Sequence, residues 1–385
     1  MAKNRILFLV DYCLTPNVKT EDAGILCEND RIIAIGGASA FSFSDEGLQI
    51  VKQENVYAMP GFIDSHVHVD YLFGETTSAT PLMGDVEVKR MGALCRYLAA
   101  HGVSAFVPTL RTVAKEKLIR NTAHLAEMIR KDFGGAIPLG IHLDGPFINP
   151  AILSTHPAEF VSEIDMGYLK ELVEAGGGRI KLLSFAPELK NSGLLIEYLL
   201  ENGIIPSIGH SLADERQTLL AVEQGARRAT DMYNAIPAFN YRQSNITDTL
   251  LTDDRVTVEI IADGSVLSRR AIDLTMRVKP RKNVVAISDT YCKDPDHLDF
   301  PALDSGWRNL KNHHALKETD AAGCFTSNPA ENIGLVSRGE LSPGKYADMV
   351  FFRTQDDTVF STYVAGNCVY SASTGEGEDK SGEGK

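Results

Sequence analysis

The segment GFIDSHVHVD (residues 61–70) places two histidines, His66 and His68, one residue apart in an otherwise apolar stretch. In an extended strand, side chains at positions i and i+2 point to the same face. Two imidazoles on one face of one strand either make separate hydrogen bonds or bind a metal ion together. The pair alone leaves both interpretations open.

Further ionisable side chains stand at the late ends of other apolar runs in the chain. Asp144 and His210 each end such a run, Asp231 lies on the next, and Asp289 ends the last. Taken alone, each is as well explained as a capping or hydrogen-bonding residue. Imidazole nitrogens and carboxylate oxygens are also the ligands of zinc and similar divalent ions. If the fold brings these residues together, a metal site explains the whole set better than separate structural roles do.

The elements that must position these residues form a repeating pattern. Apolar runs with strand character alternate with amphipathic stretches of helical character, the runs being 61–69, 103–110, 136–146, 179–188, 204–211, 226–235, 256–264 and 283–290. Eight such units are typical of an α/β fold of the (β/α)8 TIM-type barrel class, whose active site lies at the C-terminal strand ends. The pattern therefore predicts that the histidines and carboxylates converge at one barrel mouth, where they suit a divalent metal.

Shorter strands flank this region at both ends of the chain. Residues 1–58 contain apolar runs broken by turns, and strand-like runs return within 341–370. We expect the two ends to form one small β-sandwich domain, beside a barrel domain that spans 59–340. The tail over 371–385 is rich in Gly, Ser and charged residues, which predicts a disordered segment.

Composition limits the classes of partner and the location. The net charge of −13 argues against nucleic acid and against an anionic membrane, and no apolar run is long enough to span a bilayer. The six cysteines are scattered without a CxxC motif, and the apolar run at the N-terminus is too short for a signal peptide. We therefore expect a cytoplasmic protein, in which an anionic substrate needs a local Arg or Lys.

Several motifs resemble the amidohydrolase superfamily and, within it, the N-acetylglucosamine-6-phosphate deacetylase family. They occur in family order from about residue 55 to 352: PGFIDSHVH, HLDGPFINP with His156 beyond it, IGHS, DMYNAIPAF, IADG, ISDT and SNPAENIGL followed by GKYADMV. The first motif marks only the superfamily. The HLDGPFINP segment, and the Asn-Ala pair followed by an Arg, are much more specific to the deacetylases.

The resemblance implies a role for each matching residue. His66 and His68 match the metal-binding pair, and Asp144 stands where the family usually has a metal-binding Glu. His210 matches a metal-ligand His, and Asp289 matches the catalytic Asp that passes a proton between water and the leaving amine.

Four other residues match positions that hold the sugar phosphate: His156, Asn234, Ala235 and Arg242. A guanidinium such as that of Arg242 makes strong charge-assisted hydrogen bonds to phosphate. It would supply the cation that an anionic substrate needs on this acidic protein.

Three positions depart from the family pattern. Asp231 stands where the family has its second metal-ligand His, and we include it among the expected ligands because carboxylates also bind divalent ions. Asp144 is one methylene shorter than the usual Glu. Val266 replaces a His that touches the substrate carbonyl, and its side chain cannot donate a hydrogen bond. The more oxygen-rich site takes one or two ions, zinc first, with manganese, iron or magnesium as alternatives.

The resemblance implies metal-dependent hydrolysis of the acetamido group of N-acetylglucosamine 6-phosphate, giving glucosamine 6-phosphate and acetate. The changes at Asp231 and Val266 leave open an amidohydrolase acting on a different phosphorylated amide or amino sugar. A non-catalytic sugar-phosphate binder ranks last, because a binder has no need of a general base such as Asp289 beside a metal. Family members often associate, so the resemblance also implies a homodimer.

Overall fold

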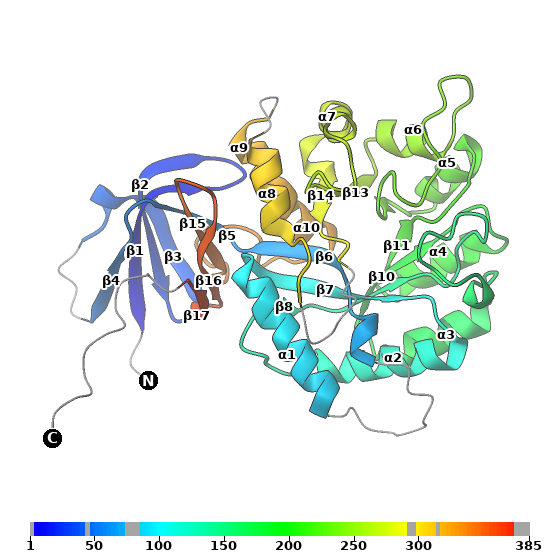
Figure 1. Cartoon of the computed structure of the whole chain (residues 1–385), viewed down its shortest axis with the longest axis horizontal. Helices are drawn as coiled ribbons and strands as arrows, with labels where there is room; N and C mark the ends of the chain where they lie inside the picture. Colours follow the sequence, from blue (N-terminus) through cyan, green and yellow to red (C-terminus); the bar gives the residue numbers. More distant parts are fainter. Residues whose placement is uncertain (1–3, 43–46, 74–84, 291–297, 313–315, 373–385) are drawn as a thin grey trace.

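The computed structural model describes residues 4–42, 47–73, 85–290, 298–312 and 316–372. Within these residues the chain forms two sheets that lie side by side along the long axis of the molecule (Figure 1). One sheet is built from both chain ends, and the other is a parallel barrel built from the middle of the chain. The predicted fold class is confirmed.

Eight parallel strands form the barrel wall in the order β14-β13-β12-β11-β10-β9-β7-β6. The last strand closes onto the first, because Asp289 N–H donates to the His66 carbonyl at 3.1 Å and His68 N–H donates to the Thr290 carbonyl at 3.0 Å. A two-residue strand, β8 (Ile137–Pro138), adds to β7. The wall strands are β6 (Phe62–His68), β7 (Val103–Arg111), β9 (Ile141–Asp144), β10 (Ile180–Phe185), β11 (Ile205–Ile208), β12 (Arg228–Ala229), β13 (Thr257–Ile261) and β14 (Val284–Ile287).

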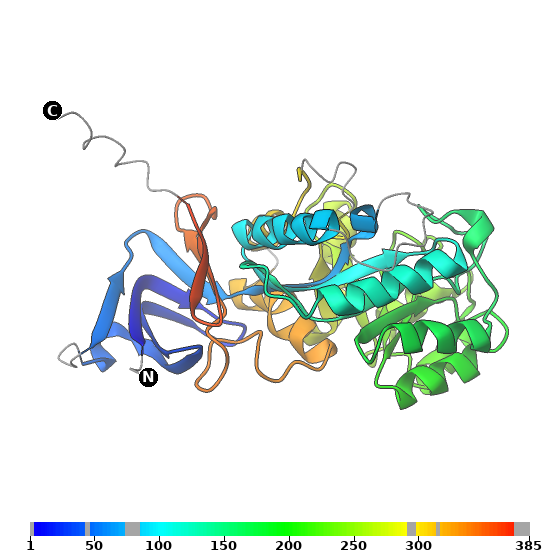
Figure 2. The same cartoon turned by 90° about the horizontal axis from the view of Figure 1, so that it is seen from below.

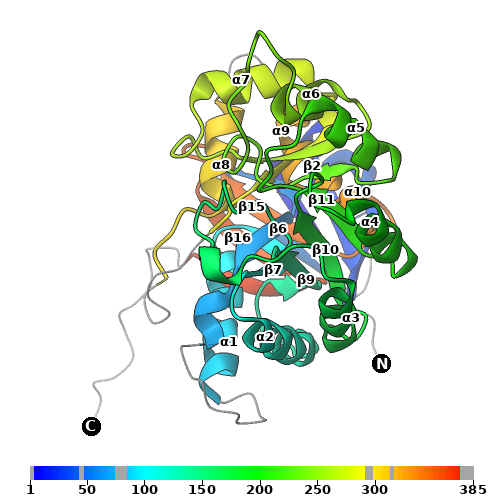
Figure 3. The same cartoon turned by 90° about the vertical axis from the view of Figure 1, so that its right-hand side faces the viewer.

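Helices surround the barrel, as the view along it shows (Figure 3). Several begin at the polar caps that favour helix initiation: Asp165 accepts from Gly167 N–H, and Asp214 forms a capping box with Gln217. The helices are α1 (Asp85–Ala100), α2 (Lys115–Met128), α3 (Met166–Ala175), α4 (Ser192–Glu201), α5 (Glu215–Glu223), α6 (Ile246–Thr252), α7 (Arg269–Val278), α8 (Leu303–Lys311), α9 (Glu318–Phe325) and α10 (Ser327–Asn332).

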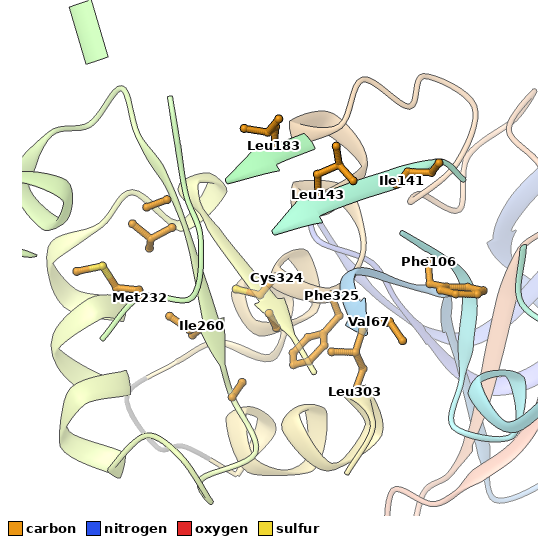
Figure 4. Close-up of a cluster of buried hydrophobic side chains, with 14 of the residues drawn as sticks. Val67, Phe106, Ile141, Leu143, Leu183, Met232, Ile260, Leu303, Cys324 and Phe325 are labelled. Atoms are coloured by element: carbon orange, nitrogen blue, oxygen red, sulfur yellow. The ribbon is translucent and has the colours of Figure 1, made fainter. Parts of the chain in front are cut away.

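The main hydrophobic core fills the space between the strands and these helices. Val67 of β6 and Phe106 of β7 belong to one buried cluster with Leu303 of α8 and Phe325 of α9 (Figure 4). The side chains that alternate with them point into the barrel. There, a smaller apolar cluster closes the lower end of the barrel against α10: Ile63, Ala105, Val107, Leu182, Ala330 and Ile333.

Above this apolar cluster, the barrel interior is polar. His142 of β9 contacts Ser184 Oγ at 2.7 Å and Thr109 Oγ1 at 3.3 Å, and Thr230 Oγ1 links the hydroxyls of Ser184 and Ser207. Burial and the nearby His66 lower the pKa of His142 to about 3, so its ring is neutral. This layer of hydrogen-bonded side chains forms the floor under the strand ends.

The second sheet has the order β17-β16-β15-β5-β1-β2-β3, with β4 on β1. Strand β1 pairs with β4 over its first half and with β5 at its end, so the sheet divides and encloses its own core around Phe8, Ile25 and Phe351. Figure 2 shows this sheet apart from the barrel helices. Its strands are β1 (Arg5–Leu14), β2 (Lys19–Glu28), β3 (Arg31–Gly37), β4 (Leu48–Lys52), β5 (Val56–Pro60), β15 (Met349–Arg353), β16 (Val359–Val364) and β17 (Asn367–Ser371).

These bounds bear on the predicted domain limits without deciding them. Strand β5 runs to Pro60 and β17 to Ser371, so each extends slightly past the predicted ends of the small domain, 58 and 370. The division into two domains stays a prediction, and residues 373–385 of the predicted tail lie outside the described residues. In the described part of the chain, no helix combines the length and apolar character needed to cross a membrane.

Candidate metal centre and active site

His66 and His68 direct their rings toward a common point inside the barrel mouth. Their Nε2 atoms lie 3.3 Å apart, and Asp289 Oδ1 lies 3.3 Å from the first and 3.1 Å from the second. Ligand atoms that bind one tetrahedral zinc ion at about 2.0–2.1 Å lie about 3.3 Å from one another. These three residues, which we call the HxH group, therefore have the separations of ligands that share one ion.

A second set of donor atoms lies in the same mouth. Asp144 Oδ2 lies 3.0 Å from His156 Nε2 and 3.4 Å from His210 Nε2, and all three side chains are buried. The ligand atoms of each set lie within 4.8 Å of one another. Asp144 thus lies with His210 and His156, while Asp289 lies with the histidine pair.

Three of the site residues share one local geometry. His210, Asp231 and Asp289 each stand two residues beyond the end of a strand, with φ values of 49°, 49° and 47°. The sequence places Asp231 on the sixth strand, and this is wrong, because β12 already ends at Ala229. The left-handed conformation is costly for most residues with a Cβ, and functional sites are among the places that hold it. Here it turns the chain sharply at the mouth of the barrel.

Carboxylates orient both rings of the histidine pair. Glu259 Oε2 lies 3.1 Å from His66 Nδ1, and Asp70 Oδ2 lies 3.4 Å from His68 Nδ1. A carboxylate on the outer ring nitrogen fixes the tautomer that leaves Nε2 free to bind a metal. Arg228 in turn holds Glu259, and Arg111 Nε donates to Asp70 at 3.2 Å.

Sequence reasoning missed these four supporting residues. A signal for two of them was present, because Glu259 and Arg228 are charged residues inside apolar strands, where a charge requires a partner. Asp70 follows His68 at the same two-residue spacing that joins the histidine pair. Nothing in the sequence marks Arg111 as its partner.

The charges around the HxH group favour a bound cation. Burial lowers the pKa of His66, but the Asp289 and Glu259 carboxylates outweigh it and raise that pKa to about 10. The pKa of His68 rises to about 9, since its close contacts with the Asp289 and Asp70 carboxylates likewise outweigh burial. Burial opposes ionisation of Asp289, yet both histidines hold its pKa below the ordinary value. Two positively charged rings 3.3 Å apart repel each other, and one divalent ion would replace both protons.

Unpaired buried atoms provide a second test of the fit to a metal ion. Asp144 Oδ1, His210 Nδ1 and Asp231 Oδ1 are buried and have no hydrogen-bond partner among the described residues. An unpartnered buried carboxylate oxygen is costly. The donor set of imidazoles and carboxylates suits zinc or manganese. The residues present therefore fit a divalent ion.

Asp231 belongs to neither set of converging ligand atoms among the described residues. Its Oδ2 accepts a hydrogen bond from Asn234 Nδ2 at 2.5 Å, and its backbone N–H donates to Glu259. Burial and the neighbouring Asp289 carboxylate raise the pKa of Asp231 to about 8. The structure thus places Asp231 in the mouth, with its side chain bound to Asn234.

The residues expected to hold a sugar phosphate occupy different surroundings. His156 and Ala235 are buried, whereas Asn234 and Arg242 are exposed on the segment between β12 and α6. Arg242 Nε donates to the Tyr241 hydroxyl at 3.0 Å. Loops that follow barrel strands line the active-site face, so these residues stand on the correct side of the barrel for a substrate.

Comparison with known proteins places the chain in a family. Residues 57–369 match the model described as "Amidohydrolase family". An N-acetylglucosamine-6-phosphate deacetylase of Danio rerio is 31% identical over 83% of this chain and 86% of its own, and one of Bacillus subtilis (strain 168) is 27% identical over 91% and 96%. The crystal structure of N-acetyl-D-glucosamine-6-phosphate deacetylase from Mycobacterium smegmatis superposes with a TM-score of 0.82 at 25% identity, covering 95% of this chain and 100% of that one. The chain belongs to the amidohydrolase family.

Proposed function

We propose that this protein is a metal-dependent deacetylase that hydrolyses the acetamido group of N-acetylglucosamine 6-phosphate to glucosamine 6-phosphate and acetate. The observation that carries the proposal is the HxH group, in which three donor atoms from β6 and the end of β14 have the separations of metal ligands. The names of the similar proteins support the substrate.

His66 and His68 would hold a divalent ion beside Asp289, and Asp144 and His210 are further metal ligands in the same mouth. When bound, a divalent ion supplies Lewis-acid chemistry, because it lowers the pKa of a water and polarises an acyl oxygen. Zinc is our first candidate, because imidazole nitrogens and carboxylate oxygens are its ordinary ligands, and manganese is the second, because carboxylates also bind it.

Asp289 would act as the general base and then the general acid. Its lowered pKa keeps it ionised at neutral pH, so it can accept a proton from the attacking water. The protonated Asp289 would then return that proton to the leaving amine nitrogen as the carbon–nitrogen bond breaks. Its place beside the histidine pair puts the proton acceptor next to the water that attacks the acyl carbon.

The substrate's phosphate would contact the segment between β12 and α6. Arg242 supplies the positive charge there, and Asn234 supplies an amide next to Asp231. We also propose a homodimer, because Phe239 and Tyr241 on this same segment are 60% and 79% exposed. Analytical ultracentrifugation tests that association.

An amidohydrolase with another phosphorylated substrate is the second candidate. Val266 favours it, because this side chain stands 52% exposed after β13 and offers no hydrogen bond to an acyl oxygen. A different amide would not need that contact. The choice concerns the substrate only, since the metal and Asp289 serve both reactions.

The deciding experiment is acetate release from N-acetylglucosamine 6-phosphate by protein reconstituted separately with zinc and with manganese. Turnover that requires the metal supports the proposal. The panel includes N-acetylgalactosamine 6-phosphate and unphosphorylated N-acetylglucosamine. If metal-loaded protein does not hydrolyse N-acetylglucosamine 6-phosphate but does hydrolyse another phosphorylated amide, the second candidate replaces the proposed function.

A further inference from the structure

We infer that Asp144, His156 and His210 hold a metal ion of their own, and that His156 is one of its ligands. The resemblance assigns His156 to the sugar phosphate, so the inference gives this residue a different role. It rests on the proposed metal-dependent function and adds a second ion, distinct from the one held by the HxH group.

The first support is the geometry of the three donor atoms. His156 Nε2 and His210 Nε2 lie 3.0 Å and 3.4 Å from the same oxygen, Asp144 Oδ2. These separations bracket the value of about 3.3 Å expected for ligands of one tetrahedral ion. The three residues are 2–5% exposed, and Asp144 Oδ1 has no hydrogen-bond partner. A buried carboxylate needs a partner charge or a metal, and a cation bound to Asp144 would supply it.

The second support is the hydrogen bonding of the outer nitrogen of His156. Thr112 Oγ1 donates to the Asp144 carbonyl at 3.4 Å, so the same oxygen can accept a hydrogen bond from His156 Nδ1, which lies 2.9 Å away. In that tautomer the lone pair of Nε2 faces the Asp144 carboxylate, an arrangement that a shared cation makes favourable. Thr112 N–H also approaches Nδ1, at 3.4 Å, and this longer contact favours the opposite tautomer. The 2.9 Å contact between Nδ1 and Oγ1 suits either direction, so a bound cation would select the tautomer that leaves Nε2 free to bind it.

The third support is the position of Asp231, which replaces the family's ligand histidine. Its Oδ2 is bound to Asn234, and its atoms are in neither converging set of the described residues. Asp144 is also shorter than the Glu of the family, so an ion bound to it lies closer to β9. His156 follows β9 in the chain. Both departures therefore shift the ion toward His156 and away from Asp231.

The test measures metal binding directly. Protein stripped with a chelator and reloaded with Co²⁺ is analysed for bound equivalents by elemental analysis and for ligand geometry by visible absorption. The variants are His156→Ala and Asp231→Ala, with His124→Ala on α2 as the matched control outside both sets. We expect wild type to bind two equivalents, and His156→Ala to weaken one of them by more than about 100-fold, beyond the roughly 10–100-fold effect of losing an outer partner.

A rescue variant separates ligand loss from misfolding. His156→Ala combined with Asp231→His restores a histidine at the family position, and we expect it to recover the second equivalent. The inference is overturned if wild type binds only one equivalent, or if Asp231→Ala removes the second ion. It is also overturned if His156→Ala lowers the affinity for the second ion by 100-fold or less, which is the effect of losing only an outer partner. These readouts do not depend on turnover, so they stand even if the proposed substrate is wrong.

Discussion

His66 Nδ1 lies 3.1 Å from Glu259 Oε2, and both side chains are buried inside the barrel. The other oxygen of Glu259 accepts from Arg228 Nε at 3.0 Å, and Arg228 also donates to Ser65 Oγ. These contacts connect Ser65 and Arg228 through Glu259 to Nδ1 of His66, whose Nε2 faces the metal site. Glu259 thus has two roles: it pairs with the buried Arg228 in the barrel and it orients the ring of His66.

Replacing Glu259 with Gln should weaken metal binding by about 10–100-fold, because an outer carboxylate orients the histidine ring and raises its basicity. Competition with a fluorescent chelator measures the affinity. Glu201→Gln, on the exposed end of α4, is the matched control. Equal affinity in wild type and Glu259→Gln would contradict an orienting role.

The same substitution should destabilise the metal-free protein in a pH-dependent way. Burial raises the pKa of Glu259, but Arg228 and His66 outweigh it and lower it to about 2 from an ordinary 4.5. The ionised form therefore stabilises the fold above about pH 4.5, and this contribution is lost as pH falls toward 2. At pH 7, Glu259→Gln leaves Arg228 buried without its partner charge, which costs about 3–5 kcal/mol.

Urea titration of chelator-treated protein at pH 3, 5 and 7 measures this effect. The difference in free energy of unfolding between wild type and Glu259→Gln should be largest at pH 5 and 7 and smaller at pH 3. If the difference in free energy of unfolding stays constant from pH 3 to pH 7, the charge of Glu259 does not cause the destabilisation.

The barrel and the convergence of the histidines could be predicted because both follow from local pattern. Strand runs of similar length recur between amphipathic segments, and the polar residues stand at one end of each run. The fold then brings His66, Asp144, His210 and Asp289 together without further information. The predicted run 226–235 is much longer than the strand within it, β12, where only Arg228–Ala229 pair.

The pairing of donor atoms could not be predicted, because it depends on side-chain directions at turns. The left-handed residues His210 and Asp289 re-aim their side chains after the strand has ended. Residues 145–156 follow no periodic pattern, so nothing in the sequence indicates that His156 returns to Asp144. The roles of these residues stay predictions until binding is measured.

Asp289→Asn should reduce kcat by about 10²–10⁴, the usual contribution of a positioned acid–base group. The amide keeps the shape of the carboxylate but cannot accept the proton from water. Because the pKa of Asp289 is lowered, wild-type activity should fall only at acidic pH, and the variant should lose this acidic limb. Metal content is measured alongside, and turnover equal to wild type in fully loaded protein would refute the role.

Arg242→Ala should raise KM for the phosphorylated substrate by about 10–100-fold, because a hydrogen bond to a charged group contributes about 1.5–3 kcal/mol. The value of kcat should change little, since Arg242 is exposed and belongs to neither group of converging ligand atoms in the described residues. Arg255→Ala, which removes a surface partner of Asp253, is the control. An equal rise in KM for unphosphorylated N-acetylglucosamine would show that Arg242 does not bind the phosphate.

Val266→His should raise kcat if the acyl oxygen of the substrate lies near this position. A hydrogen-bond donor aimed at such an oxygen contributes about 10²–10³ in rate, and the exposed site leaves room for an imidazole. Leu274→His, on a similarly exposed position of α7, controls for an added histidine. Steady-state kinetics with zinc-loaded protein measure both variants. A gain in kcat confined to Val266→His would show that the acyl oxygen lies within reach of residue 266, as in the deacetylase family. An unchanged kcat would mean that another group already donates a hydrogen bond to that oxygen.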